Sequence, residues 1–216
     1  MTVLYLARHG ETTWNVAGRY QGRLESDLSP LGVRQGLALA EYFSARSRRG
    51  ESVPTRAIAS PLERCAATAR FVAGRLGVPL ETDARLIEIA HGTWEGRYRE
   101  EIATNDPKRY EMWRNDPARV AFENGETLAE VRDRWRAFAA TLSGDDGDLL
   151  VVTHDAVVRC ALLDVAGRPL DDLWHPRVEN GGFALLENDG GKLRVVEECV
   201  VSHLTGLRSP LAGQAL

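Results

Sequence analysis

Two histidines follow short apolar runs, and each has charged neighbours. Arg8 and His9 come directly after the run Val3–Ala7, and His154 follows Leu149–Thr153. An imidazole can attack phosphorus with one ring nitrogen while a backbone carbonyl holds the other nitrogen in place. An adjacent arginine adds a permanently charged, planar fork of donors that suits phosphate. The pair therefore indicates phosphoryl chemistry, although either histidine taken alone is more often structural.

A second guanidinium follows another apolar run in the same way. Arg64 lies shortly after Thr55–Ala59, in the segment SPLER. Ser60 as N-cap, Pro61 as the first helical residue and Glu63 as the capping-box residue predict a helix that begins there. Helix N-termini meet the ligand crevice at the carboxyl ends of parallel strands, so Arg64 is expected near the two histidines. Without them, the motif would describe a capped helix with a surface arginine.

The strands that must position these residues are predicted to form a parallel sheet. The three apolar runs suit buried strands, and strands that run directly into helices are typical of parallel pairing. Phe183–Glu187 and Leu193–Cys199 flank the turn at 188–191 and predict an antiparallel hairpin. The expected fold is a three-layer α/β/α sandwich with a mostly parallel central sheet and an antiparallel edge strand.

Capping signals predict two further helices. Ser29 followed by Pro30 opens a helix that runs to about residue 47. Thr127 and Glu130 form a capping box ahead of a helix that ends at about residue 142. The final residues, 204–216, are expected to form an irregular tail.

Hydrophobic periodicity is lost between 97 and 126, where prolines interrupt a polar and aromatic segment. We expect an insertion over the active site there, within a single domain that spans residues 1–216. This segment is the expected source of substrate specificity. The side chains in it that could meet a polar substrate are Arg97, Tyr98, Arg99, Lys108, Arg109, Tyr110, Trp113 and Arg114.

The order and spacing of these motifs resemble the histidine phosphatase superfamily, also called phosphoglycerate mutase-like, and within it the phosphatase branch. The resemblance extends over nearly the whole chain. The matching segments are RHGET at 8–12, Asn15, Gln21 with Gly22, SPLERCAATA at 60–69, Glu88, GTWEG at 92–96, GET at 125–127 and THDAVVR at 153–159.

The resemblance implies a phosphate pocket made of Arg8, His9, Arg64 and His154, with His9 as the nucleophile. A phosphoryl group in transfer spreads negative charge over its oxygens, so fixed donors and cations stabilise it. We expect two arginines and a protonated His154 to supply that charge. His9 must be neutral to attack, and cationic neighbours disfavour a second positive charge there.

The resemblance also implies roles for residues around this pocket. Glu88 is the implied general acid, while Glu11 and Glu95 are rivals on residue type alone. Asn15 and Gln21 are expected to border the pocket and to contact the phosphoryl group or the substrate.

Asp155 departs from the glycine that usually follows the second histidine of this family. A carboxylate aimed at the phosphate would repel it, so we expect Asp155 to point elsewhere. The residues from Ala156 onward suit a helix, and Asp155 is predicted to be its N-cap. The alternative is that Asp155 accepts a hydrogen bond from a substrate hydroxyl or amine and determines specificity.

Composition limits the remaining possibilities. The net charge of −4 and the pI near 5.8 do not favour nucleic acid as a partner. No apolar stretch suits a membrane span and the N-terminus lacks signal-peptide features, so a cytoplasmic protein is expected. Cys65, Cys160 and Cys199 are unevenly spaced and predict free thiols. No Walker loop, D-x-D-x-T segment or H-E-x-x-H helix indicates a metal site, and no cofactor is expected.

The predicted function is that of a metal-independent phosphomonoesterase acting on a small phosphorylated metabolite through a phosphohistidine at His9. A cofactor-dependent phosphoglycerate mutase, which is an isomerase, is the first alternative, but such mutases are usually longer than 216 residues. A non-catalytic phosphate-binding protein is the second, and retention of all the motif residues disfavours it. The sequence indicates neither the physiological substrate nor the oligomeric state.

Overall fold

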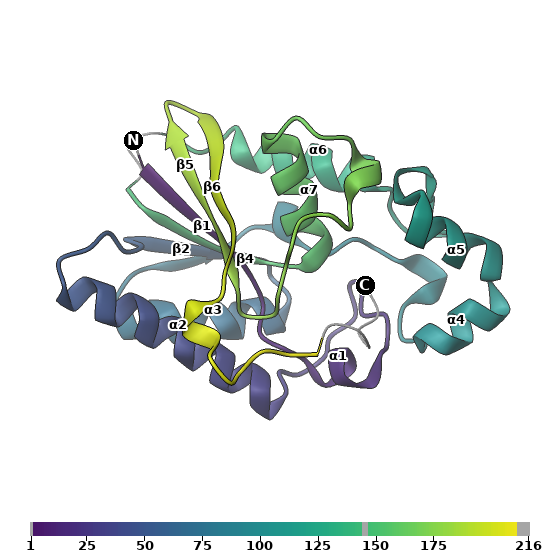
Figure 1. Cartoon of the computed structure of the whole chain (residues 1–216), viewed down its shortest axis with the longest axis horizontal. Helices are drawn as coiled ribbons and strands as arrows, with labels where there is room; N and C mark the ends of the chain where they lie inside the picture. Colours follow the sequence, from purple (N-terminus) through teal and green to yellow (C-terminus); the bar gives the residue numbers. More distant parts are fainter. Residues whose placement is uncertain (1, 144–146, 211–216) are drawn as a thin grey trace.

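The computed structural model describes residues 2–143 and 147–210. Over this part of the chain a six-stranded sheet has the order β3-β2-β4-β1-β5-β6 (Figure 1). Strands β1 to β4 are parallel, whereas β5 and β6 are antiparallel, which confirms the predicted sheet. The strands are β1 (Thr2–Arg8), β2 (Arg56–Ala59), β3 (Leu80–Thr82), β4 (Leu149–Thr153), β5 (Phe183–Asp189) and β6 (Lys192–Val200).

The register of the central strands brings the chemically important residues to one edge. Arg8 at the end of β1 is paired with Thr153 at the end of β4. Ala59 at the end of β2 is paired with Val152 of β4. The residues that follow these three strands therefore leave the sheet side by side at its carboxyl edge, where open α/β sheets bind ligands.

Helices cover both faces of the sheet and give the three expected layers (Figure 1). Along β1, Tyr5 and Ala7 belong to the hydrophobic cluster formed with α2 and α3. Leu4 and Leu6 point the opposite way and belong to the cluster formed with α6 and α7. These helices are α2 (Pro30–Arg48), α3 (Glu63–Leu76), α6 (Leu128–Ala139) and α7 (Asp155–Val165).

Two of the predicted helix starts are confirmed. The Ser29 side chain accepts a hydrogen bond from the Gly32 backbone N–H, with Pro30 as the first residue of α2. Thr127 and Glu130 form the capping box of α6. Helix α6 ends at Ala139, three residues before the predicted end.

The predicted cap of α3 is wrong. This helix begins at Glu63 with Leu62 as its N-cap, and the Leu62 side chain makes no capping hydrogen bond. The Glu25 carboxylate accepts from the Glu63 backbone N–H at 3.1 Å. The Ser60 hydroxyl lies 2.8 Å from Nε2 of His154, which follows the neighbouring strand β4. A tertiary contact in the site has therefore replaced the local cap, and Arg64 still lies in the first turn of α3.

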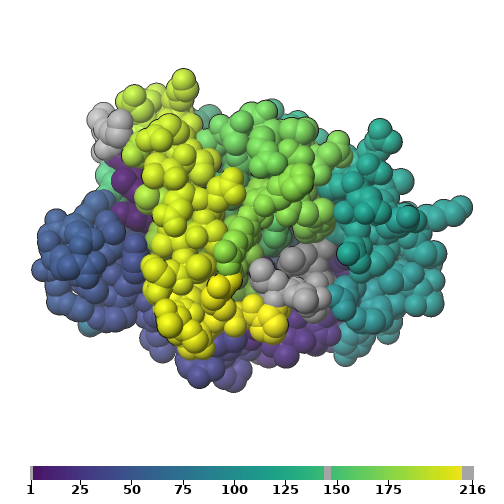
Figure 2. All heavy atoms as spheres, viewed as in Figure 1, coloured from purple at the N-terminus to yellow at the C-terminus, as the bar shows by residue number. Residues whose placement is uncertain are grey.

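Residues 97–126 contain two short helices that the periodicity did not indicate. Figure 2 shows them in teal as a lobe at one end of the molecule. Phe122 packs edge to face against Trp94 and Trp113, in an apolar cluster that this region shares with α6 and α7. The short elements are α1 (Thr13–Ala17), α4 (Arg99–Asn105), α5 (Pro107–Asn115), and the 3-10 turns Ala84–Leu86, Gly92–Trp94, Pro117–Arg119, Leu170–Asp172 and Ser202–Leu204.

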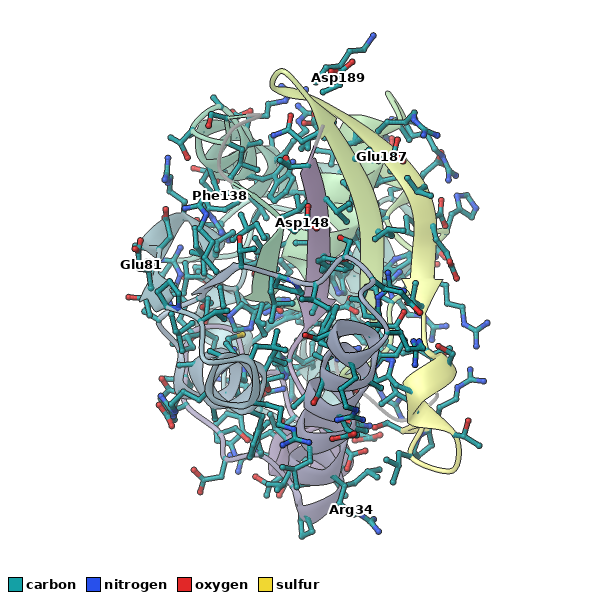
Figure 3. The ribbon with its side chains drawn as sticks, turned by 90° about the vertical axis from the view of Figure 1, so that its left-hand side faces the viewer. Arg34, Glu81, Phe138, Asp148, Glu187 and Asp189 are labelled. Carbon is teal, nitrogen blue, oxygen red and sulfur yellow. The ribbon has the colours of Figure 1, made fainter. Side chains whose placement is uncertain are left out.

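The last strands form the predicted hairpin, with Asp189 at its tip (Figure 3). Residues 205–210 have neither helix nor strand, as expected, and the rest of the predicted tail, 211–216, lies outside the described residues. Arg208 donates to the Glu179 carboxylate, and Gln35 donates to the Leu207 carbonyl at 2.8 Å. Within the described residues, no helix is long and apolar enough to cross a membrane. The cysteines are free.

Candidate active site

His9 has a fixed orientation at the end of β1. Its backbone N–H donates to the Thr153 carbonyl at 2.9 Å, and its ring Nδ1 lies 2.7 Å from the Gly10 carbonyl oxygen. Because a carbonyl only accepts, Nδ1 must carry the hydrogen, so Nε2 of the neutral ring keeps its lone pair. A methyl group at Gly10 would lie 2.6 Å from the Gly32 carbonyl oxygen, which explains the glycine after the histidine.

His9 lines a cavity that contains about 410 Å³ of space free of protein atoms, part of it open to solvent. The ring is almost completely buried. Burial lowers the pKa of His9 well below its usual value, and the charges of Arg64 and Arg8 lower it further. The ring is therefore neutral near pH 7, as attack on phosphorus requires.

Arg64 lines the same cavity and is held by the loop before α2. Its Nη1 donates to the Leu24 carbonyl at 2.8 Å, and its Nη2 donates to the Gly22 carbonyl at 2.7 Å. Gly22 has a φ of +50°, and a methyl group there would collide with the Glu95 carboxylate. This loop also carries Gln21, which lines the cavity as predicted.

Arg8 and Asp155 form a buried ion pair, and the predicted capping role of Asp155 is wrong. His154 is the N-cap of α7, and Asp155 is the first residue of the helix. One carboxylate oxygen lies 3.2 Å from Nη1 of Arg8, and the other lies 2.6 Å from Nε of Arg159. The two buried guanidinium groups require a negative partner, and pairing them stabilises the fold more than a helix cap by Asp155 would. Asp155 also lines the cavity, so its alternative role in specificity stays a prediction.

His154 is completely buried and lies behind His9. The two rings meet edge to face with centroids 5.3 Å apart. Burial lowers the pKa of His154 well below its usual value, and Arg64 adds to this effect. The expectation of a cationic His154 is therefore wrong, because desolvation and a nearby guanidinium both oppose a positive charge on this ring. His154 contacts Ser60 and the thiol of Cys65, 3.4 Å from Nε2.

Glu88 and Asp155 are the two acidic residues of the described cavity lining, and Glu88 is the one that forms no ion pair with an arginine among the described residues. One oxygen accepts a hydrogen bond from the Ile89 backbone N–H at 2.9 Å. Burial raises the pKa of Glu88 to about 7, so a large fraction of the group holds a proton at neutral pH. The other two candidates for the general acid accept hydrogen bonds from neighbouring residues. Glu11 accepts from the Ser29 hydroxyl, and Glu95 accepts from the His91 backbone N–H.

Asn15 lies next to the site but does not belong to the described lining of the cavity. Its side-chain oxygen accepts from the Thr12 backbone N–H at 3.1 Å, which completes the capping box of α1. Asn180 donates to the same oxygen at 3.3 Å. The expectation that Asn15 contacts the phosphoryl group stays a prediction.

The structure adds lining residues that the sequence reasoning missed. Of the eight candidates between 97 and 114, only Trp113 is found among the described lining residues. The missed residues are His91, Ala156, Leu173 and Trp174. His91 stands three positions after Glu88 in a motif already recognised, and that spacing was the available signal. Among the described residues, no cluster of three or more histidine, cysteine or acidic side chains could hold a metal ion.

The fold and site together define a class of phosphoryl-transfer protein. A neutral, oriented histidine, two guanidinium groups and a carboxyl group with a raised pKa line one cavity at the carboxyl edge of an open α/β sheet. A family model for the histidine phosphatase superfamily (branch 1) matches residues 4–200, and the chain belongs to this family. It is a phosphoric monoester hydrolase.

The sequences of several named phosphatases align with most of this chain. Phosphoserine phosphatase 1 of Hydrogenobacter thermophilus is 31% identical over 94% of this chain and 95% of its own length. Adenosylcobalamin/alpha-ribazole phosphatase of Escherichia coli is 31% identical over 85% of this chain and 89% of its own. The structure of Bacillus stearothermophilus YhfR is similar with a TM-score of 0.85 and 32% identity, covering 94% of this chain and all of that one.

Proposed function

We propose that this chain is a metal-independent phosphomonoesterase that hydrolyses a small phosphorylated metabolite through a phosphohistidine at Nε2 of His9. The observation that carries the proposal is the 2.7 Å contact between Nδ1 of His9 and the Gly10 carbonyl oxygen. It leaves an unprotonated Nε2 on a ring that lines a cavity with two guanidinium groups.

The first half-reaction forms the bond between Nε2 of His9 and phosphorus. The phosphorus–oxygen bond of the ester breaks, and Glu88 gives its proton to the leaving oxygen. In the second half-reaction, water attacks the phosphohistidine and Glu88 takes a proton from that water. Inorganic phosphate leaves, and both residues return to their starting states.

The charge required in the transition state comes from side chains. Arg8 and Arg64 provide planar donors for the equatorial oxygens, which supports chemistry without a metal ion. Asp155 offsets part of the charge of Arg8 and keeps that guanidinium in place. Neutral His154 positions the His9 ring by its edge-to-face contact.

The named relatives support a small substrate, since they are phosphatases of phosphoserine and of adenosylcobalamin or alpha-ribazole phosphate. Return of the phosphoryl group to the substrate, as in a mutase, is the alternative reaction, and no specific contact in the cavity favours it. The three free thiols support a cytoplasmic location.

The test is to trap the phosphoenzyme with a radiolabelled aryl phosphate in excess chelator. We expect full turnover and an acid-labile, alkali-stable label in the wild-type protein, and neither in His9→Ala. His175→Ala, at an exposed histidine, is the matched control and should behave as wild type. Activity that disappears with chelator and returns with magnesium would overturn metal independence, and an undiminished label in His9→Ala would remove His9 as nucleophile.

A further inference from the structure

The cavity is lined by two chemically different groups of residues. The polar group holds the proposed nucleophile, the ionisable residues Arg8, Arg64, Glu88 and Asp155, and also Gln21 and Gly22. The other group is apolar or aromatic, and its rings contact one another. It consists of His91, Trp113, Ala156, Leu173 and Trp174. A phosphate bound by the arginines would therefore direct the remainder of its ester towards a mostly uncharged wall.

This wall is held rigidly. Trp174 donates from Nε1 to the Trp113 carbonyl at 3.1 Å, and the two indole rings meet edge to face at 5.3 Å. The Arg159 guanidinium lies 5.4 Å from the centre of the Trp174 ring and is itself fixed by Asp155. Rigid aromatic surfaces bind flat apolar groups at little cost in side-chain entropy.

His91 is a buried polar group with unmet hydrogen bonds. The ring is 4% exposed, and neither of its nitrogens has a hydrogen-bond partner among the described residues. Its ring is packed by Tyr20 at 5.1 Å, Phe122 at 4.8 Å and Trp113 at 5.7 Å. A neutral imidazole offers one donor and one acceptor, and leaving both unpaired in the interior is unfavourable. A ligand in the cavity can satisfy them.

His91 does not supply a cation for a charged substrate. Burial lowers its pKa to about 3, so the ring is neutral at pH 7. The cationic groups of the described lining are Arg8 and Arg64, and the proposed reaction uses both of them to bind phosphate. A carboxylate on the leaving group would lose its hydration against the aromatic wall without gaining a cationic partner there. An ammonium would have to compete with Arg8 and Arg159 for the Asp155 carboxylate.

We propose that this cavity selects phosphate esters whose leaving group is uncharged, flat and largely apolar, with one hydroxyl or similar neutral group that hydrogen-bonds to His91. This inference rests on the proposed phosphatase activity and adds the class of substrate. Phosphorylated amino acids, which carry an ammonium and a carboxylate, are then poor substrates, in contrast to the named function of one relative.

The first test compares four esters with the wild-type protein: phenyl, hydroxymethylphenyl and naphthyl phosphate, and phosphoserine. Phenol and naphthol are leaving groups of similar quality, so their difference reports mainly on binding. We expect the KM of naphthyl phosphate to be about tenfold below that of phenyl phosphate, because its second ring is buried on the wall. Phosphoserine should have the lowest kcat/KM of the four.

The second test removes the aromatic wall. Trp174→Leu should remove the difference in KM between naphthyl phosphate and phenyl phosphate. Trp14→Leu is the matched control, since Trp14 is half-buried outside the cavity and packs on Arg19 at 4.3 Å. Its preference for naphthyl phosphate should remain as in wild type.

The third test removes the hydrogen-bonding nitrogens of His91. His91→Phe keeps an aromatic ring among aromatic neighbours and should keep the melting temperature. It should lower kcat/KM for hydroxymethylphenyl phosphate about tenfold more than for phenyl phosphate. His91→Gln should retain part of this preference, which keeps the test valid if the phenylalanine variant folds poorly. His175→Phe is the exposed control.

The outcomes separate the two proposals. Turnover of all esters without preference, or phosphoserine as the best substrate, would overturn the substrate class and leave the phosphatase activity standing. An equal loss on phenyl and hydroxymethylphenyl phosphate in both His91 variants would also overturn it. No turnover of any ester would defeat the proposed function itself.

Discussion

Replacement of Glu88 by glutamine tests the proposed acid through stability as well as activity. The pKa of Glu88 is raised by burial from 4.5 to about 7. Below pH 4.5 the folded and unfolded chains both hold the proton, and above pH 7 the folded chain must bury a carboxylate. The free energy of unfolding of the wild type should therefore fall by about 3 kcal/mol between these limits, a loss that Glu88→Gln avoids.

The assay is urea unfolding of wild type and Glu88→Gln at intervals from pH 5 to pH 9. The variant should gain stability relative to wild type as pH rises from 5 to about 7, and the difference should level off above that pH. Glu197→Gln, at an exposed position of β6, controls for loss of a carboxylate alone and should show little such trend. A difference between Glu88→Gln and wild type that is constant over this range would refute the reasoning.

Kinetics then show whether the proton serves catalysis. Glu88→Gln should lower kcat on an alkyl phosphate by about 100-fold or more, and on nitrophenyl phosphate by less than about tenfold, because nitrophenolate leaves without protonation. Equal losses would make Glu88 a structural residue. A loss that depends on the leaving group in Glu95→Gln or Glu11→Gln would transfer the role.

Two further predictions concern the charges beside His9. Arg64→Lys keeps the charge but loses the paired contacts to Gly22 and Leu24, so kcat/KM should fall by about 100-fold in a steady-state assay while the melting temperature changes little. A lysine variant with full activity would show that charge alone suffices. Asp155→Asn should destabilise the fold by about 3 kcal/mol in urea unfolding, since Arg8 and Arg159 lose their shared carboxylate. An unchanged midpoint would contradict the structural importance of this pair.

The sequence predicted elements whose signals are local. Each central strand is a short apolar run, and Ser29 and Thr127 provide their own caps, so the sandwich could be expected without tertiary information. Strand β3 has only the residues Leu80–Thr82, two of them exposed, and offers no such pattern. Helices α4 and α5 are short and polar, so they show no clear hydrophobic periodicity. They are stabilised by the tertiary packing of their few apolar side chains.

The site was predictable where a residue's place follows from a strand end. Arg8, His9 and Arg64 meet because β1 and β2 end at the same edge of the sheet. Trp174 comes from a loop that packs against Trp113 of the 97–126 region, and the sequence carries no local sign of that contact. For His91 the only signal was its spacing from Glu88. Ser60 is the opposite case: its sequence context predicted a helix cap, but in the structure its hydroxyl contacts His154.

Charge states were the least predictable feature, and the structure gives one cause for several of them. Desolvation is the largest influence on the pKa values of His9 and Glu88, lowering the first and raising the second. The same burial therefore prepares a neutral nucleophile and a protonated acid at neutral pH. It also keeps His154 neutral, so the pocket relies on the two guanidinium groups for positive charge. Asp155 is shared between Arg8 and Arg159 and therefore offsets only part of the charge of Arg8. Arg64 has no such carboxylate partner among the described residues and is fixed by two backbone carbonyls, so its charge is available to an incoming phosphate dianion.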